Sequence, residues 1–298
     1  MRELPNLTLP QMLRENARAM PERIALRQKD FGIWLPISWA EYDRRARHFG
    51  LGLRALGLGE GGHVGILSEN RAEWVVAQLG AGMVGAAETG VYATSPANED
   101  AYVRRHAEDE IVVCQDQQQA DKVLERIAEL PRLKRIVVID PKGLRHYGSE
   151  LIISFADVLK SGAEYEIVHP SLVEACLAAQ TPADIGLMVY TSGSTGKPKG
   201  AMLSYRNMRA QAAGVIERLG YDADTTNLSY LPLCHVAEQM LSTMAPIYVG
   251  SCVSFGESIR TVQEDLREIA RTLFFGVPRI WEKLHAAIHI KLMEAGGW

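Results

Sequence analysis

Glycines, hydroxyl side chains and two lysines gather in one stretch of the sequence, Tyr190-Thr191-Ser192-Gly193-Ser194-Thr195-Gly196-Lys197-Pro198-Lys199-Gly200. Glycines and small hydroxyl residues let backbone N–H groups converge on one anion, and the lysines add positive charge. The apolar run 185–189 precedes the stretch, and a segment with a helical pattern begins near Ser204. The pattern predicts a loop that grips a polyphosphate between a strand and a helix.

The spacing of this loop differs from that of the common P-loop, which reads G-x-x-x-x-G-K-[ST]. Only Ser194 and Thr195 separate its two glycines, and Pro198 stands where a serine or threonine should follow the lysine. Because proline lacks an N–H and disfavours helical angles at the preceding residue, the loop is expected to stay extended past Lys197. The alternative is an ordinary solvated Gly/Ser loop, and the two lysines within the ordered pattern argue against it.

Composition excludes several classes of protein. The 298 residues are 47% hydrophobic and 23% charged, which is a globular composition, and the net charge of −4 argues against nucleic acid as a partner. The longest apolar tract, 74–87, is too short and glycine-rich to span a bilayer, so we expect a soluble protein with peripheral membrane contact left open. Widely spaced cysteines favour a reducing, cytoplasmic location over disulfides or zinc: Cys114, Cys176, Cys234 and Cys252.

The elements that must position the loop follow from hydrophobic periodicity. Helices are expected at 9–20, 39–56, 70–79, 99–108, 120–130, 204–219, 260–271 and 279–294. Strands are expected at 24–26, 34–37, 63–67, 111–113, 135–139, 185–189, 229–231, 252–255 and 273–277. Residues 140–180 should be less regular, apart from a short helix at 155–159.

This alternation of strands and helices predicts an α/β fold with mostly parallel sheets between helices. We expect two subdomains, 1–180 and 181–298, of which the second carries the phosphate loop. The early strands of the first subdomain are free to pair with the second.

Three other patterns are weaker. Residues 80–85 spell G-x-G-x-x-G, but a helical segment precedes them where a dinucleotide site needs a strand, so close packing or a helix end is predicted. His285 and His289 stand four apart without a third ligand, so no metal site is predicted. A serine hydrolase is disfavoured because G-x-S-x-G is absent around Ser192 and Ser194.

The stretch 190–200 resembles the phosphate-binding loop of the adenylate-forming (AMP-binding) superfamily, which includes acyl-CoA synthetases, aryl-CoA ligases, luciferases and peptide-synthetase adenylation domains. Similar segments follow the family order at 39–42, 92–98, 231–239 and 273–283. The last two are most like the long-chain fatty-acid–CoA ligases. The resemblance implies the N-terminal large domain of these enzymes.

The resemblance also implies site residues. The ATP phosphates would be held by Thr191, Ser192, Gly193, Ser194, Thr195, Gly196, Lys197 and Lys199. The acyl pocket would include His235, Phe275, Gly276 and Val277, where the glycine lets a chain pass close to the backbone. From the residues alone, a capped core histidine is the favoured interpretation of His235, and only the phosphate loop upstream shifts it to the pocket. Tyr205 stands where the family usually has histidine.

Such an enzyme uses ATP and Mg²⁺ to convert a long-chain fatty acid to an acyl-adenylate, then transfers the acyl group to coenzyme A. The family's later motifs, including a magnesium-binding glutamate, a ribose-binding aspartate and a catalytic lysine, do not occur in this sequence. No catalytic residue is therefore assigned, and the chain is expected to be a truncated large domain, inactive alone. The alternatives are an enzyme that adenylates an aryl acid or serves a carrier protein, and a non-catalytic nucleotide- or acyl-binding fragment.

Overall fold

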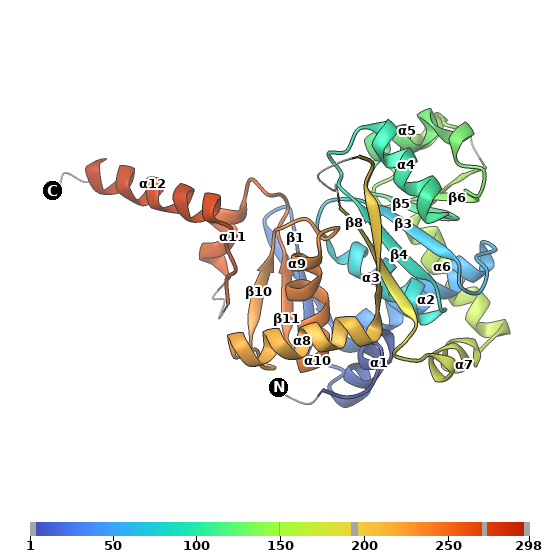
Figure 1. Cartoon of the computed structure of the whole chain (residues 1–298), viewed down its shortest axis with the longest axis horizontal. Helices are drawn as coiled ribbons and strands as arrows, with labels where there is room; N and C mark the ends of the chain where they lie inside the picture. The colour runs from blue at the N-terminus through green and yellow to red at the C-terminus, as the bar shows by residue number, and fades with distance from the viewer. Residues whose placement is uncertain (1–3, 149, 192–195, 270–272, 295–298) are drawn as a thin grey trace.

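The computed structural model of the chain describes residues 4–148, 150–191, 196–269 and 273–294. Two sheets and the helices around them make up this part of the chain (Figure 1). Three short helical segments are η1 (Ile127–Glu129), η2 (Leu144–His146) and the π-helix η3 (Met240–Met244). The α-helices are α1 (Leu9–Ala19), α2 (Trp39–Ala55), α3 (Ala72–Met83), α4 (Ala97–Ala107), α5 (Gln117–Glu125), α6 (Phe155–Val168), α7 (Leu172–Ala179), α8 (Tyr205–Leu219), α9 (Val236–Gln239), α10 (Ala245–Val249), α11 (Val262–Glu268) and α12 (Pro278–Glu294).

The larger sheet has seven strands in the order β7-β6-β5-β3-β4-β8-β9. In chain order these are β3 (His63–Leu67), β4 (Ala87–Val91), β5 (Ile111–Cys114), β6 (Arg135–Val138), β7 (Ile152–Ser154), β8 (Ile185–Thr191) and β9 (Lys199–Ser204). All neighbours pair in parallel except β8 and β9, which are antiparallel. Every residue of β4 and β5 is buried, as expected for parallel strands that helices cover on both faces.

The smaller sheet has four strands in the order β10-β11-β1-β2. They are β1 (Ile24–Asp30), β2 (Ile33–Ser38), β10 (Thr226–Ser229) and β11 (Cys252–Phe255). Strands β10, β11 and β1 are parallel, and β2 runs antiparallel to β1. The start of the chain therefore pairs with a distant segment: Leu26 of β1 lies beside Val253 of β11.

The boundary expected near residue 180 does not separate the two sheets. Strands β8 and β9 follow residue 180 and complete the larger sheet beside β4. Strands β1 and β2, from the start of the chain, belong to the smaller sheet instead. The two sheets thus interleave along the sequence, and the division into subdomains 1–180 and 181–298 stays a prediction.

Helix α3 links the two sheets, since it contacts β3 and β4 of the larger sheet and β1 of the smaller. Gly80 of α3 faces Gly50 of α2, where a Cβ on Gly50 would lie 2.3 Å from the Gly80 carbonyl oxygen. Two helices can approach this closely only where side chains are absent. The glycines at 80–85 therefore serve helix packing and end α3, which confirms that they do not form a dinucleotide-binding loop.

Three expectations about local structure are wrong. Residues 140–180 hold β7, α6 and α7, and α6 is stabilised where Phe155 stacks on Phe49 with ring centroids 4.7 Å apart. Residues 273–277 form no strand, although Phe274 stacks on Tyr230 at 5.4 Å. Strands β4 and β9 are missed, because β4 carries polar residues and glycine and β9 has exposed side chains, so neither shows a strand pattern.

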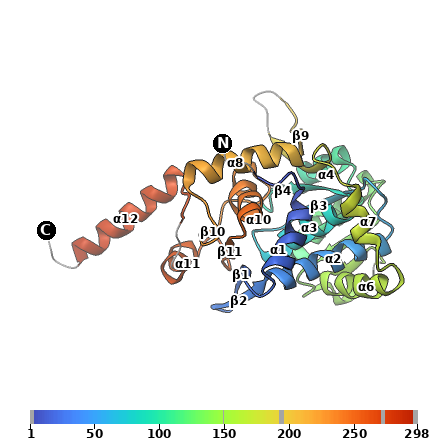
Figure 2. The same cartoon turned by 90° about the horizontal axis from the view of Figure 1, so that it is seen from below.

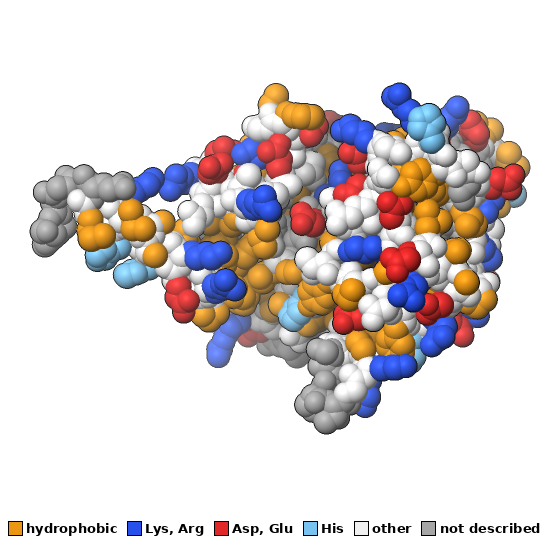
Figure 3. Space-filling model, turned by 90° about the horizontal axis from the view of Figure 1, so that it is seen from above, with side chains coloured by type: hydrophobic (Ala, Val, Ile, Leu, Met, Phe, Trp, Pro, Cys, Tyr) orange, Lys and Arg blue, Asp and Glu red, His pale blue; other side chains and the backbone are white. Residues whose placement is uncertain are grey.

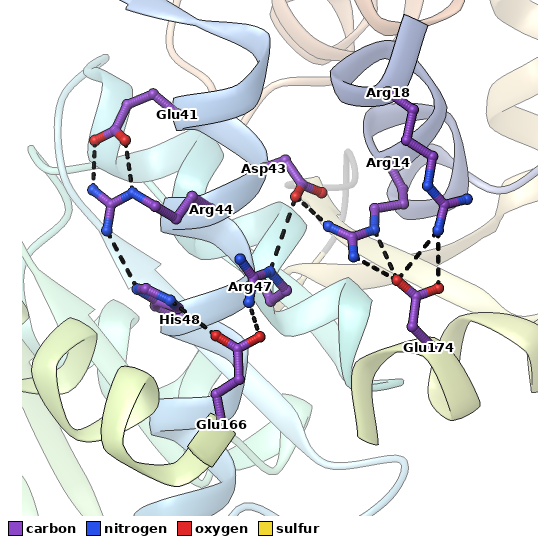
Figure 4. A network of polar contacts seen from close by, with 9 residues as sticks. All are labelled: Arg14, Arg18, Glu41, Asp43, Arg44, Arg47, His48, Glu166 and Glu174. Atoms are coloured by element: carbon purple, nitrogen blue, oxygen red, sulfur yellow. Dashed lines mark hydrogen bonds and ion pairs between the residues drawn. The ribbon is translucent and has the colours of Figure 1, made fainter. Parts of the chain in front are cut away.

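Charged side chains fasten α1 and α6 to α2, and α7 to α1 (Figure 4). Arg14 of α1 lies 2.5 Å from Asp43 of α2 and 2.5 Å from Glu174 of α7. Arg47 of α2 pairs with Asp43 on its own helix and with Glu166 of α6. Because these groups are only partly exposed, the network orients the outer helices on α2 more firmly than isolated surface pairs would.

Helix α12 extends away from both sheets in two perpendicular views (Figure 1, Figure 2). Its exposed apolar side chains include Trp281, Ile288, Ile290 and Leu292, and Figure 3 shows hydrophobic side chains on this projecting segment. Among the described helices, none combines the length and the hydropathy that crossing a membrane requires.

Candidate functional site

The carboxyl ends of parallel strands from both sheets point to one region of the molecule. In parallel α/β sheets, ligands bind in the crevice outside these ends. Here the segments that follow β3, β4, β10 and β11 all contribute to one cavity of about 170 Å³. It is lined by Ser68, Glu69, Asn70, Tyr92, Ala93, Thr94, Leu228, Ser229, Tyr230, Pro232, Cys234, Gly256, Ser258, Ile259, Val262 and Asp265.

The predicted phosphate loop joins β8 to β9, which form an antiparallel hairpin. Thr191 at the end of β8 pairs with Lys199 at the start of β9. The prediction of a loop between a strand and a helix is therefore wrong in part, because β9 intervenes before α8. The chain does stay extended beyond Lys197, as Pro198 requires. Ser192, Gly193, Ser194 and Thr195 lie outside the described residues.

Helix α8 begins directly after the hairpin. Ser204 caps it, accepting a hydrogen bond from the Asn207 backbone N–H at 3.3 Å, while the Asn207 side chain accepts one from the Ser204 backbone N–H at 3.1 Å. Such a reciprocal cap satisfies two backbone donors at the helix start. Tyr205, which stands where the family usually has histidine, is buried, its backbone N–H donates to the Asp184 carbonyl at 3.1 Å, and its ring lies against Gly186 of β8. The cap thus fixes where the hairpin ends.

Asn70, which follows β3, ties the two sheets together at the cavity. Its Nδ2 donates to the Leu231 carbonyl at 2.5 Å and to Ser229 Oγ at 2.9 Å, and its Oδ1 accepts from the Leu233 backbone N–H at 3.0 Å. One amide side chain thereby fixes the segment that connects β10 to α9. Sequence reasoning missed Asn70, although a polar residue just after a buried strand is a usable signal.

The four residues predicted for the acyl pocket lie in two places. His235 is exposed, and its Nδ1 accepts a hydrogen bond from the Ala237 backbone N–H at 3.1 Å, which caps α9. Phe275 lines a small cavity with Leu228, Tyr230 and Leu241, among others.

The backbone around the other two predicted residues is held by aromatic side chains. The Val277 backbone N–H donates to the Tyr230 hydroxyl at 3.3 Å. The Gly276 carbonyl accepts from Trp281 Nε1 at 2.9 Å, and a Cβ on Gly276 would meet that same nitrogen at 2.5 Å. Tyr230 lines both the small cavity and the larger one, so it connects residues 275–277 to the candidate site.

Sequence reasoning also missed the residues that give the larger cavity its shape. Gly90 of β4 lies under Cys234, where a Cβ would come within 2.9 Å of the Cys234 Cα. The glycine therefore lets the segment after β10 lie directly on β4, and Tyr92 follows at the rim. Burial raises the pKa of the Cys234 thiol to about 12, so this sulfur stays protonated at neutral pH and is not a nucleophile.

A buried ion pair lies behind the wall of the cavity to which Asp265 contributes. Lys29 of β1 lies 2.9 Å from Asp265 of α11, and both side chains are almost fully buried. Hydrogen bonds to Glu268 and Asp265 raise the pKa of Lys29 above its ordinary value. Gly256 makes room for this pair, since a Cβ there would lie 2.3 Å from the Asp265 carboxylate. The pair holds α11 against the smaller sheet.

Glu238 in α9 is a buried titratable group that lines the small cavity together with Phe275. Its carboxylate accepts hydrogen bonds from Ser229 Oγ at 2.6 Å and from the hydroxyl of Ser242 in η3. Burial raises the pKa of Glu238 to about 7, although these hydrogen bonds act in the opposite direction. The group therefore links the end of β10 to the π-helix and gains or loses a proton near neutral pH.

Replacing Glu238 with glutamine should flatten the pH dependence of stability. In the folded protein Glu238 holds its proton up to about pH 7, whereas the unfolded chain releases it near the ordinary glutamate value of 4.5. The native state thus binds more protons between these values, so wild-type stability should fall as pH rises from about 4.5 to 7, by on the order of 3 kcal/mol. Urea unfolding at pH 5, 6, 7 and 8 measures the difference between Glu238→Gln and wild type. Parallel curves would contradict the shifted pKa.

The fold of this chain is also found in solved structures. A long-chain-fatty-acid-CoA ligase of Archaeoglobus fulgidus superposes with a TM-score of 0.75 at 19% identity, covering 91% of this chain and 52% of that one. ATP-bound MatB of Rhodopseudomonas palustris gives a TM-score of 0.74 at 22% identity, covering 94% of this chain and 51% of that one. The fold is that of the N-terminal part of adenylate-forming enzymes, which confirms the predicted fold class.

The family model for AMP-binding enzymes matches residues 13–296. The chain belongs to this family, which confirms the resemblance seen in its motifs. The long-chain-fatty-acid–CoA ligase ACSBG2 of Xenopus laevis is 33% identical over 294 residues, covering 94% of this chain and 38% of that protein. ACSBG2 of Homo sapiens is 32% identical, covering 95% and 42%. The chain thus spans about two fifths of the length of these relatives.

Proposed function

We propose that the complete protein is an AMP-forming long-chain fatty-acid–CoA ligase, to which this chain contributes the phosphate loop and part of the acyl site. The observation that carries the proposal is the position of the two ends of the loop: Thr191 of β8 pairs with Lys199 of β9, β8 lies beside β4, and β4 leads into the cavity at the strand ends. The names of the curated relatives support the choice of a fatty acid and coenzyme A as substrates.

Thr191, Gly196, Lys197 and Lys199 are the described members of the proposed grip on the β- and γ-phosphates of ATP. Attack by a carboxylate on the α-phosphorus places negative charge on the departing pyrophosphate. Fixed cations and N–H donors that offset this charge lower the barrier without reorganising. This is the role that we assign to the loop, and the same proposal includes Ser192, Gly193, Ser194 and Thr195, which lie outside the described residues.

Mg²⁺ would neutralise further phosphate charge in such a reaction. No group of three or more His, Cys, Asp or Glu side chains that could hold a metal ion occurs among the described residues. We therefore assign no residue of this chain to Mg²⁺ and derive no step through it. The catalytic lysine of the family is likewise assigned to no residue here.

The acyl chain is proposed to enter the cavity at the strand ends. Tyr92, Leu228 and Ile259 offer apolar surface there, and burial of an alkyl chain contributes about 25 cal/mol per Å². We also propose that the acyl pocket includes His235, Phe275, Gly276 and Val277. Tyr230 connects the small cavity beside Phe275 to the cavity at the strand ends. We also propose a cytoplasmic location with peripheral membrane contact.

The test uses the protein expressed from its complete reading frame, read past the codon for Trp298. ATP–pyrophosphate exchange is measured with a panel of short-, medium- and long-chain fatty acids, aryl acids and amino acids. We expect the fastest exchange with long-chain fatty acids, followed by thioester formation with free coenzyme A. Exchange with aryl acids alone, or adenylation without transfer to free coenzyme A, would favour the aryl-acid or carrier-protein alternative. Binding of ATP without exchange would favour a non-catalytic module.

A further inference from the structure

Two aromatic side chains of α4 face the hairpin that carries the phosphate loop. Tyr102 and His106 stand four residues apart on α4, one above the other, with ring centroids separated by 5.8 Å. Neither belongs to the phosphate-loop motif. Each contacts a different arm of the hairpin, so the pair lies against both sides of the loop's stem.

Tyr102 contacts the arm that leads out of the loop. Its hydroxyl donates a hydrogen bond to the Pro198 carbonyl at 3.2 Å. The Lys197 ammonium lies over the same ring, 5.1 Å from the centroid, which is within the range of a cation–π interaction. One side chain thereby fixes both the backbone and the charged group of this arm.

His106 contacts the arm that leads into the loop. Its Nδ1 shares a hydrogen bond of 2.7 Å with the Tyr190 hydroxyl, and the two rings meet edge to face at 5.7 Å. Burial raises the pKa of Tyr190 to about 12, so its hydroxyl stays protonated at neutral pH. Across the hairpin the Tyr190 ring lies against Gly200, where a Cβ would come within 2.9 Å of the ring. These contacts fix the distance between the two arms of the hairpin.

Arg104 holds helix α4 in place. It lies between Tyr102 and His106 in the sequence, and its side chain is on the opposite face of the helix. Arg104 is 1% exposed and donates to the carboxylates of Asp100 and Asp109, and to the backbone carbonyls of Thr89 in β4 and Ile66 in β3. The aromatic face of α4 is therefore fixed relative to the strands that end at the candidate site.

We propose that Tyr102 and His106 are positioning residues for polyphosphate binding, and that the Tyr102 ring pre-orients the Lys197 ammonium. The inference rests on the proposed function of the loop and adds residues that its motif does not contain. A free lysine side chain samples many rotamers, and ordering it on binding costs free energy. A ring that already restricts the ammonium to one side of the hairpin reduces this cost.

Replacement of Tyr102 with leucine tests the proposal in the protein expressed from its complete reading frame. We expect KM for ATP to rise roughly two- to fivefold, the effect of losing one exposed cation–π contact, with KM for the acid unchanged. Tyr102→Phe keeps the ring and should retain most of the affinity. Tyr165→Leu is the matched control, because the Tyr165 ring of helix α6 also lies beside a histidine four residues later, with its centroid 4.2 Å from that of His169.

A second measurement separates this proposal from the proposed function. Calorimetry with inorganic tripolyphosphate on the 298-residue chain should show weaker binding by Tyr102→Leu than by wild type. In a protein that already carries Lys197→Met, adding Tyr102→Leu should cause no further loss of tripolyphosphate affinity. That coupling distinguishes positioning of the lysine from a general structural effect. If wild type supports no exchange but the coupling is found, the proposed function fails and this inference stands. Unchanged or tighter binding by Tyr102→Leu, equal losses in both backgrounds, or no binding by wild type would overturn it.

Discussion

Replacing Lys197 with alanine in the protein expressed from its complete reading frame is expected to slow ATP–pyrophosphate exchange by roughly 10²- to 10³-fold. This is the loss measured when one preorganised group that stabilises developing charge is removed from an active site. Pyrophosphate gains negative charge as it leaves, so the ammonium acts more strongly on the transition state than on bound ATP. The loss should therefore fall mainly on kcat, while KM for the fatty acid stays constant.

Lys142→Ala is the matched control for this result. Lys142 follows β6, its side chain is 84% exposed, and it forms an ion pair with Asp140 at 3.4 Å. Removing it changes the net charge of the protein by the same amount without touching the hairpin. Exchange at the wild-type rate by Lys197→Ala would remove the phosphate role from this loop. A similar loss in Lys142→Ala would show that net charge, and not position, is responsible.

The phosphate loop could be found from sequence because its signal is local. The residue types of 190–200 and their order carry the interpretation, and Pro198 by itself predicts that the chain stays extended. The following strand β9 could not be found in this way. Its side chains are mostly exposed, and its strand structure depends on pairing with β8, which periodicity does not report.

The cavity could not be predicted because its lining comes from four separate segments of the chain. Asn70, Tyr92, Cys234 and Ile259 meet only after β1 has paired with β11 and α3 has packed against both sheets. Such contacts join residues far apart in sequence, so no local pattern records them. The acyl-site prediction at His235 shows the same limit, since the residue type was noticed but its capping role depends on where α9 begins.

Strand β4 was missed for an electrostatic reason. Glu88 is the second residue of this strand, and a charged residue normally marks an exposed position. In the folded protein this carboxyl is fully buried, and burial raises its pKa well above the ordinary value. Burial therefore favours the neutral form of this acid, and β4 is a buried strand whose sequence does not look like one.

Arg104→Met is expected to destabilise the protein by about 3–5 kcal/mol, the usual cost of removing one partner from a buried charge cluster. The guanidinium lies 3.1 Å from Asp100 and 2.9 Å from Asp109. All three side chains are buried, with 1% solvent exposure or less. Without Arg104 these carboxylates would be buried with no opposing charge. Burial already raises the pKa of Asp109 to about 6, and loss of the arginine should raise it further.

The destabilisation should therefore be larger at pH 8 than at pH 5, because the uncompensated carboxyls can take up protons as the pH falls. Urea unfolding at both values measures it. Arg132→Met is the matched control: Arg132 lies 2.7 Å from Glu108, but both side chains are more than half exposed, so a change within about 1 kcal/mol is expected. A triple variant, Arg104→Met with Asp100→Leu and Asp109→Leu, should recover much of the loss, since no buried charge remains.

A loss for Arg104→Met no larger than that for Arg132→Met would show that the buried cluster does not hold α4. The same variant also connects stability to the site. Arg104 fixes the helix whose other face presents Tyr102 and His106 to the hairpin, so any folded fraction of Arg104→Met should bind tripolyphosphate more weakly than wild type. The triple variant should recover stability without recovering this affinity, because its apolar side chains cannot donate to the carbonyls of Thr89 and Ile66 that set the position of α4.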